Sequence, residues 1–186
     1  KMSEMPKEKF NAILEALGTL DKRVFMKYDE QFKPENTPNN VYMAAGFAQN
    51  DVLGKSKVIL FITNGGTLSY QEGIKNRCPM LIIPFTGEQY RNALRAEKDK
   101  NGAMMLFDDI DAKSLAEKIK ELTSGSEYFA KAKESQMAFT STAVEPLKEA
   151  IFWIENVIKN QRSSGLETGH LSSCIQRLGI DVAAFY

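Results

Sequence analysis

Residues 58–72 read VILFITNGGTLSYQE, and this stretch decides the fold that we expect. It begins with an apolar run without alternation, 58–62, which is typical of a strand covered on both faces in a parallel sheet. Gly65 and Gly66 follow the strand and lead into a segment that we expect to be helical. A strand joined to a helix through a tight glycine turn indicates a βαβ unit.

Further apolar runs and helical patterns surround this stretch. The predicted strands are 23–28, 41–45, 58–63, 80–84 and 103–107. The predicted helices begin at Pro6, run from Glu88 to about Lys100, run from the N-cap Asp111 to near Gly125, and begin again at Pro146. The last of them carries one apolar stripe, formed by Leu147, Ile151, Ile154 and Ile158. This alternation predicts an α/β domain with a Rossmann-like, doubly wound parallel sheet.

The ends of the chain set the expected domain boundaries. We expect residues 1–160 to form the domain and 161–186 to form a tail. The first predicted helix precedes any strand, whereas a doubly wound half usually begins with a strand. We therefore expect the domain to lack its first strand and the natural protein to extend further on the N-terminal side.

Composition excludes several classes of protein. The 186 residues are 43% apolar and 26% charged, which is typical of one globular domain. Lys+Arg and Asp+Glu balance at 24 each, so nothing favours nucleic acid as a partner. No apolar run approaches the roughly 20 residues of a membrane-spanning helix, so we expect the chain as given to be soluble.

Cysteine and histidine are too few for a zinc site. Cys78 and Cys174 lie far apart, and His170 is the single histidine. Nitrogen and sulfur ligands alone therefore do not reach the usual count for zinc, and we expect no metal site. We expect Cys78 to be a buried free thiol and His170 to be an ordinary surface or packing residue.

The glycine turn has the features of an anion site. A helix that begins after a strand presents free N–H groups and a positive dipole end to an anion. Gly65 and Gly66 allow close approach, and Thr67 and Ser69 add hydroxyl donors. Glu72 lies about 9 Å further along the helix, where it can accept hydrogen bonds from a ribose. The alternative is a tight turn without any ligand.

A second polar pair follows the next strand. Glu88 and Gln89 come after the run at 80–84, so they emerge at the same carboxyl edge of the sheet, where open α/β sheets bind ligands. An acid–amide pair suits the many hydroxyls of a sugar. The alternative is a solvated helix start in which Glu88 merely complements the dipole.

Together these motifs resemble a known family. In order they are QNDVLG from Gln49, FITNGGT from Phe61, Glu72, Cys78-Pro79-Met80, PFTGEQ from Pro84, and Arg91-Asn92. Their order and spacing are similar to the signature of the family-1 UDP-glycosyltransferases, the animal UDP-glucuronosyltransferases in particular. The likeness extends from Ser3 to Glu155 and implies the C-terminal, donor-binding half of a GT-B fold. In that fold the donor and the acceptor bind in the cleft between two Rossmann-like halves.

The resemblance implies a role for each motif residue. It assigns the uracil to Gln49, with Phe47 as a possible substitute for a stacking ring, and it assigns the ribose to Glu72. The diphosphate is assigned to Asn64, Gly65, Gly66, Thr67 and Ser69. The sugar hydroxyls are assigned to Glu88 and Gln89. The catalytic histidine of the family, with its aspartate partner, lies in the N-terminal half, so we expect no catalytic residue here and no cofactor besides the UDP-sugar co-substrate.

Three positions depart from the family pattern. Asn64 stands where a histidine is usual, and an amide forms only a neutral hydrogen bond, about half as strong as a charge-assisted one. Gly46 stands where the family has a tryptophan that stacks on uracil; the ring of Phe47 either replaces it or packs inward. Glu88 replaces an aspartate and adds one methylene.

The sequence thus leads to one main hypothesis and an alternative. The main one is the donor half of an inverting UDP-glycosyltransferase that moves glucuronate or glucose to small lipophilic acceptors. The alternative is a non-catalytic pseudoenzyme, or a donor-binding subunit with weakened UDP binding. The resemblance further implies an acceptor site in a missing N-terminal half, a missing C-terminal membrane span, a lumenal location at the endoplasmic reticulum and a role in detoxification.

Overall fold

The computed structural model describes residues 5–28, 34, 36–55 and 57–159. The chain divides into two units between Ser141 and Thr142, and each is described by itself. The expected tail at 161–186, with His170 and Cys174, lies outside the described residues, as does the start of the family likeness at Ser3.

The described strands are short and pair in parallel. They are β1 (Val24–Lys27), β2 (Val41–Ala44), β3 (Phe61–Thr63), β4 (Met80–Ile82) and β5 (Gly102–Met104). β1 pairs with β2 in one sheet, and β3, β4 and β5 form a second sheet in that order.

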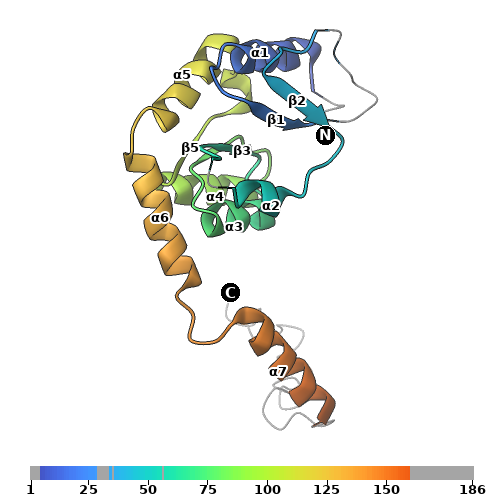
Figure 1. Cartoon of the computed structure of the whole chain (residues 1–186), viewed down its shortest axis with the longest axis vertical. Coiled ribbons are helices and arrows are strands. Elements are labelled where there is room, and N and C mark those ends of the chain that lie inside the picture. Colours follow the sequence, from blue (N-terminus) through green and yellow to red (C-terminus); the bar gives the residue numbers. More distant parts are fainter. Residues whose placement is uncertain (1–4, 29–33, 35, 56, 160–186) are drawn as a thin grey trace, which may run out of the picture. The chain divides into compact units, whose positions relative to one another are not determined.

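Helices connect the strands of the first unit, and a further helix at 146–159 belongs to the second unit (Figure 1). They are α1 (Lys7–Gly18), α2 (Gln49–Leu53), α3 (Thr67–Lys75), α4 (Gly87–Lys98), the 3₁₀ turn Phe107–Asp109, α5 (Ala112–Thr123), α6 (Glu127–Thr140) and α7 (Pro146–Lys159). α1 packs beside α5, and α6 packs against α3.

The strand order confirms the predicted doubly wound fold. The usual order is 3-2-1-4-5-6. If β1 and β2 are taken as strands 2 and 3, and β3 to β5 as strands 4 to 6, the two sheets reproduce this order on either side of strand 1. No described residue forms strand 1 of that order.

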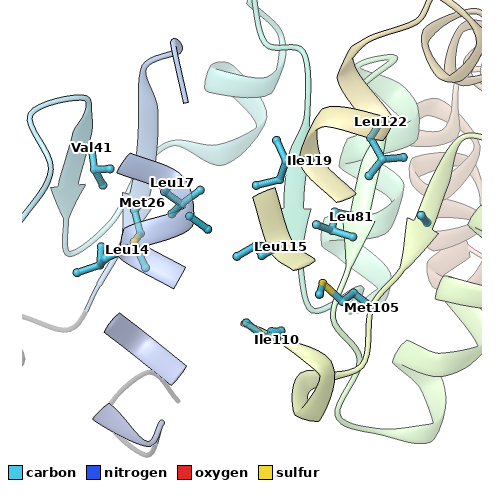
Figure 2. Close-up of a cluster of buried hydrophobic side chains, with 12 residues drawn as sticks. Leu14, Leu17, Met26, Val41, Leu81, Met105, Ile110, Leu115, Ile119 and Leu122 are labelled. Carbon is cyan, nitrogen blue, oxygen red and sulfur yellow. The ribbon is translucent and has the colours of Figure 1, made fainter. Parts of the chain in front are cut away.

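The middle strand of the larger sheet shows why the domain has helices on both faces. Leu81 belongs to a buried cluster that includes Leu115 and Ile119 of α5. Its neighbours Met80 and Ile82 belong to a second cluster, which includes buried residues of α3 and α4. Successive side chains of a strand point to opposite faces, so a strand buried on both sides needs a continuous apolar run. Figure 2 shows the first of these clusters.

All five predicted strands exist, but the third begins later than predicted, the fourth already ends at Ile82, and the fifth spans Gly102–Met104, so that Phe107 lies in the 3₁₀ turn instead. The run from Val58 is apolar, yet the Val58 N–H donates to the carbonyl of Lys55, which makes a turn. Pairing starts where the Phe61 N–H donates to the carbonyl of Pro79. Apolar composition marks burial here, whereas the hydrogen-bonded neighbour decides where the strand begins.

The predicted helices are also present, with small shifts. Asp111 is the N-cap of α5 and accepts a hydrogen bond from the Ser114 N–H at 2.8 Å, as expected for an aspartate cap. Pro6 is the N-cap of α1 rather than its first helical residue, because its ψ of 135° is extended. The sequence predicted neither the short α2 nor α6, whose apolar residues form no clear single stripe.

The α7 helix begins at Pro146 as predicted, and none of its residues is buried. Its stripe lies exposed, with Leu147 at 65% and Ile158 at 67% of full accessibility. Among the described residues, no helix is long and apolar enough to cross a membrane.

Cys78 is a buried free thiol, as predicted. Burial raises the pKa of this thiol to about 12. Since the thiolate is the reactive form, the side chain is protected both by its position and by its protonation.

Truncation of the middle strand should destabilise the domain strongly. Leu81 is 0% exposed, so Leu81→Ala leaves a cavity and should lower the free energy of unfolding by about 2–5 kcal/mol. Leu68→Ala is the matched control, because Leu68 is 77% exposed and should change stability by less than about 0.5 kcal/mol. Urea denaturation measures both. Equal losses in the two variants would contradict the assigned core.

Alkylation tests the burial of Cys78. In a Cys174→Ser background, iodoacetamide at pH 8 should leave the folded chain unlabelled, because burial holds the thiol protonated and out of reach. The same reagent should label the chain fully in denaturing urea. Mass spectrometry counts the added groups, and equally fast labelling without urea would show that Cys78 is accessible.

Candidate functional site

Three loops carry the predicted site residues to one edge of the sheets. One loop follows β2 and contains Gly46 and Phe47, and the second follows β3 and contains 64–66. The third follows β4 and leads to Glu88. All three leave the carboxyl ends of parallel strands, which is where open α/β sheets bind ligands.

Gly65 determines how the second loop turns. Its φ of +80° lies in the left-handed region, and a Cβ at this position would stand 2.6 Å from Cγ2 of Ile82. The Asn92 side chain of α4 donates to the carbonyl of Gly65 at 2.7 Å. The loop is therefore tied both to β4 and to α4.

Side chains within the loop complete the turn. The Gly65 N–H donates to Oγ1 of Thr63 at 3.2 Å, and the Gly66 N–H donates to Oδ1 of Asn64 at 3.3 Å. Asn64 is exposed and directs its carbonyl oxygen at its own loop. Its amide group is left to donate to a ligand.

The predicted uracil and ribose residues lie in contact. Nε2 of Gln49 donates to Oε2 of Glu72 at 2.7 Å and to Oγ of Ser69 at 3.1 Å. The three residues come from α2 and α3, which pack together. The bond uses only one side of the Glu72 carboxylate, which leaves an oxygen to accept hydrogen bonds from a ribose.

Glu88 contacts the start of α3. Its Oε1 accepts hydrogen bonds from the Thr67 N–H at 3.0 Å and from the Thr67 hydroxyl. The hydroxyl and then the amide of Thr67 lower the pKa of the Glu88 carboxyl, and the positive charge of Arg91 lowers it further. The carboxylate stays ionised and exposed at the positive end of α3.

Gln89 has a structural role at the start of α4. Its Oε1 accepts hydrogen bonds from the Phe85 N–H at 2.7 Å and the Thr86 N–H at 3.3 Å, which secures the start of α4. The amide N–H groups are the part of Gln89 left for a sugar hydroxyl.

Phe47 lies away from these contacts. Its ring meets the ring of Phe25 on β1 edge to face, with centroids 5.9 Å apart, and both rings keep part of their surface exposed. At Gly46, by contrast, a Cβ would meet nothing within 4 Å. The open position beside the site is thus Gly46.

Asn92 is a site residue for which the sequence predicted no role. It stands in the Arg91-Asn92 pair of the motif, and its contact joins positions 27 residues apart in the chain. The motif contains Asn92, but no local pattern indicated its contact with Gly65.

Other features of the described residues lie apart from this site. No group of three or more acidic, histidine or cysteine side chains among them is arranged to hold a metal ion. A surface hollow between α4 and α6 is lined by residues such as Arg95, Asp99 and Ser135. None of the residues that line it belongs to the predicted donor site.

The whole chain matches one protein family. Residues 1–186 match the family described as "UDP-glucoronosyl and UDP-glucosyl transferase". UDP-glucuronosyltransferase 1A6 of Oryctolagus cuniculus is 31% identical over 188 residues, which cover 99% of this chain and 34% of that protein. UDP-glucuronosyltransferase 1A1 of Rattus norvegicus is 32% identical over 189 residues, with 99% and 34% covered. The chain therefore spans about a third of the length of these relatives.

Solved structures show the same fold at low sequence identity. The spinosyn forosaminyltransferase SpnP superposes with a TM-score of 0.72 at 16% identity, covering 85% of this chain and 40% of that one. The glycosyltransferase VinC, solved in complex with DTDP, gives a TM-score of 0.71 at 17% identity and covers 84% and 38%.

These similarities agree with the motif order and with the strand order of the sheets. The fold is the Rossmann-like half of a GT-B glycosyltransferase. The chain belongs to the family of UDP-glucuronosyl and UDP-glucosyl transferases.

Proposed function

We propose that this chain binds a UDP-sugar and is the donor half of an inverting UDP-glycosyltransferase that moves glucuronate or glucose to small lipophilic acceptors. One observation carries the proposal. Gln49 is hydrogen-bonded to Glu72, which lies within α3, and Glu88 is hydrogen-bonded to Thr67 at the start of the same helix. Family membership and the DTDP-bound relative VinC support a nucleotide ligand at this edge.

The donor is arranged along α3. The diphosphate lies at the helix start, beside the Gly65-Gly66 turn, where Thr67 and Ser69 donate hydrogen bonds. The ribose hydroxyls donate to Glu72, one turn beyond Thr67, and the uracil edge meets Gln49. In this proposal Glu88 and Gln89 bind the hydroxyls of the sugar.

Glycosyl transfer also requires the N-terminal half of the GT-B fold. Transfer to an acceptor hydroxyl needs a general base beside that hydroxyl, and the family places this base in the N-terminal half. The acceptor, the membrane anchor and the lumenal location at the endoplasmic reticulum belong to a longer protein in this proposal. The role of the chain is to orient the donor.

A non-catalytic donor-binding protein is the second candidate. Two observations favour it: Asn64 offers the diphosphate an amide in place of a cation, and Gly46 offers uracil no ring. Both reduce affinity for UDP without removing the helix start that binds it.

Glu72→Ala tests the ribose contact. UDP titrated into the chain by calorimetry should bind, and Glu72→Ala should weaken UDP roughly tenfold or more, because a hydrogen bond to a charged group contributes about 1.5–3 kcal/mol. The wild-type chain should prefer UDP over 2′,3′-dideoxy-UDP, and the variant should lose that preference. Glu117→Ala, an exposed change on α5, is the matched control. Absence of heat and of any thermal shift at millimolar UDP would overturn the proposed function.

Gly46→Trp should restore a stacking surface. A Cβ at this position meets nothing within 4 Å and its backbone is not in the left-handed region, so the backbone there accepts a side chain. Base–aromatic stacking contributes about 1–3 kcal/mol, and UDP should therefore bind about fivefold tighter or more. Inorganic pyrophosphate, which has no base, should bind unchanged. Equal gains for both ligands would contradict a uracil site beside Gly46.

A further inference from the structure

The start of α3 is already occupied by a negative group. Thr67 is the first residue of this nine-residue helix, and its N–H has no acceptor within the helix. A carboxylate oxygen of Glu88 takes that N–H at 3.0 Å and takes the Thr67 hydroxyl as well. Glu88 comes from α4, 21 residues further along the chain, so the contact is tertiary and not a local cap.

The proposed function gives the same two donors to a diphosphate. A carboxylate and a phosphate cannot both accept from one N–H, and their negative charges repel. Glu88 is exposed, its hydrogen bonds among the described residues go to Thr67, and its other charged neighbour is Arg91. It can rotate away when a stronger anion arrives.

We propose that Glu88 occupies the diphosphate position in the ligand-free chain and must be displaced by the nucleotide. This inference rests on the proposed function. The displaced carboxylate finds new partners only if the ligand carries sugar hydroxyls next to the diphosphate. Glu88 therefore favours UDP-sugar over UDP and promotes release of the UDP that remains after transfer.

The length of the side chain matters for this contact. Glu88 has one methylene more than an aspartate would have, and its Oε1 bonds directly to the first turn of α3. Glu88→Asp keeps the charge but draws it back from Thr67. It therefore separates the effect of the contact from the effect of the charge.

Calorimetry with three ligands tests the proposal. We expect Glu88→Ala to bind UDP and inorganic pyrophosphate about fivefold tighter or more, since both then take Thr67 without competition. The affinity for UDP-glucose and UDP-glucuronate should rise less, because the variant lacks the carboxylate that accepts from the sugar hydroxyls. The preference for UDP-sugar over UDP should therefore shrink. Glu88→Asp should bind UDP with an affinity between those of the wild-type chain and Glu88→Ala. Glu117→Ala should leave the affinity for every ligand unchanged.

A ligand-free readout completes the test. In ¹⁵N-labelled chain the Thr67 amide resonance should shift in Glu88→Ala, and UDP added to the wild-type chain should shift it as well. Thermal melting confirms that the variants fold. If the wild-type chain binds UDP and Glu88→Ala binds it equally or more weakly, or if the Thr67 resonance does not move, displacement is overturned while the proposed function stands. If neither chain binds UDP, both proposals fail.

Discussion

The close approach of Gly65 to β4 is the constraint on which the site depends. Without a side chain and with a positive φ, this residue lets the chain turn directly over Ile82 from β3 into α3. The first turn of α3 thereby comes level with the start of α4. Asn92 reaches the Gly65 carbonyl and Glu88 reaches Thr67 only because of this alignment.

Without a ligand, the site residues satisfy one another. Gln49 holds Glu72, Asn64 caps its own loop, Gln89 secures the start of α4, and Glu88 holds Thr67. Such contacts keep side chains ordered, which reduces the entropy lost on binding. They also make binding an exchange of hydrogen bonds. The exchange is most demanding at Thr67, where one anion must replace another.

Much of this site follows from the sequence, because its signals are local. The buried strand, the glycine turn and the helix start lie within 58–72, and the acid–amide pair follows the next strand at Glu88. The contacts that the sequence did not predict join residues that lie far apart in the chain. The bond between Asn92 and Gly65 and the packing of Phe47 on Phe25 join positions more than twenty residues apart. No local pattern records such contacts.

By itself, the sequence determined the class of fold, the order of the motifs and the residue types at the carboxyl edge, because continuous apolar runs and glycine turns impose a local geometry on the backbone. Tertiary structure alone decided where β3 begins. It also decided that Leu81 faces α5, while Met80 and Ile82 face α3 and α4. Finally, it placed Glu88 at the helix start that is assigned to the diphosphate. The physical reason is that strand pairing, burial and charge contacts are set by neighbours brought together only in the folded chain.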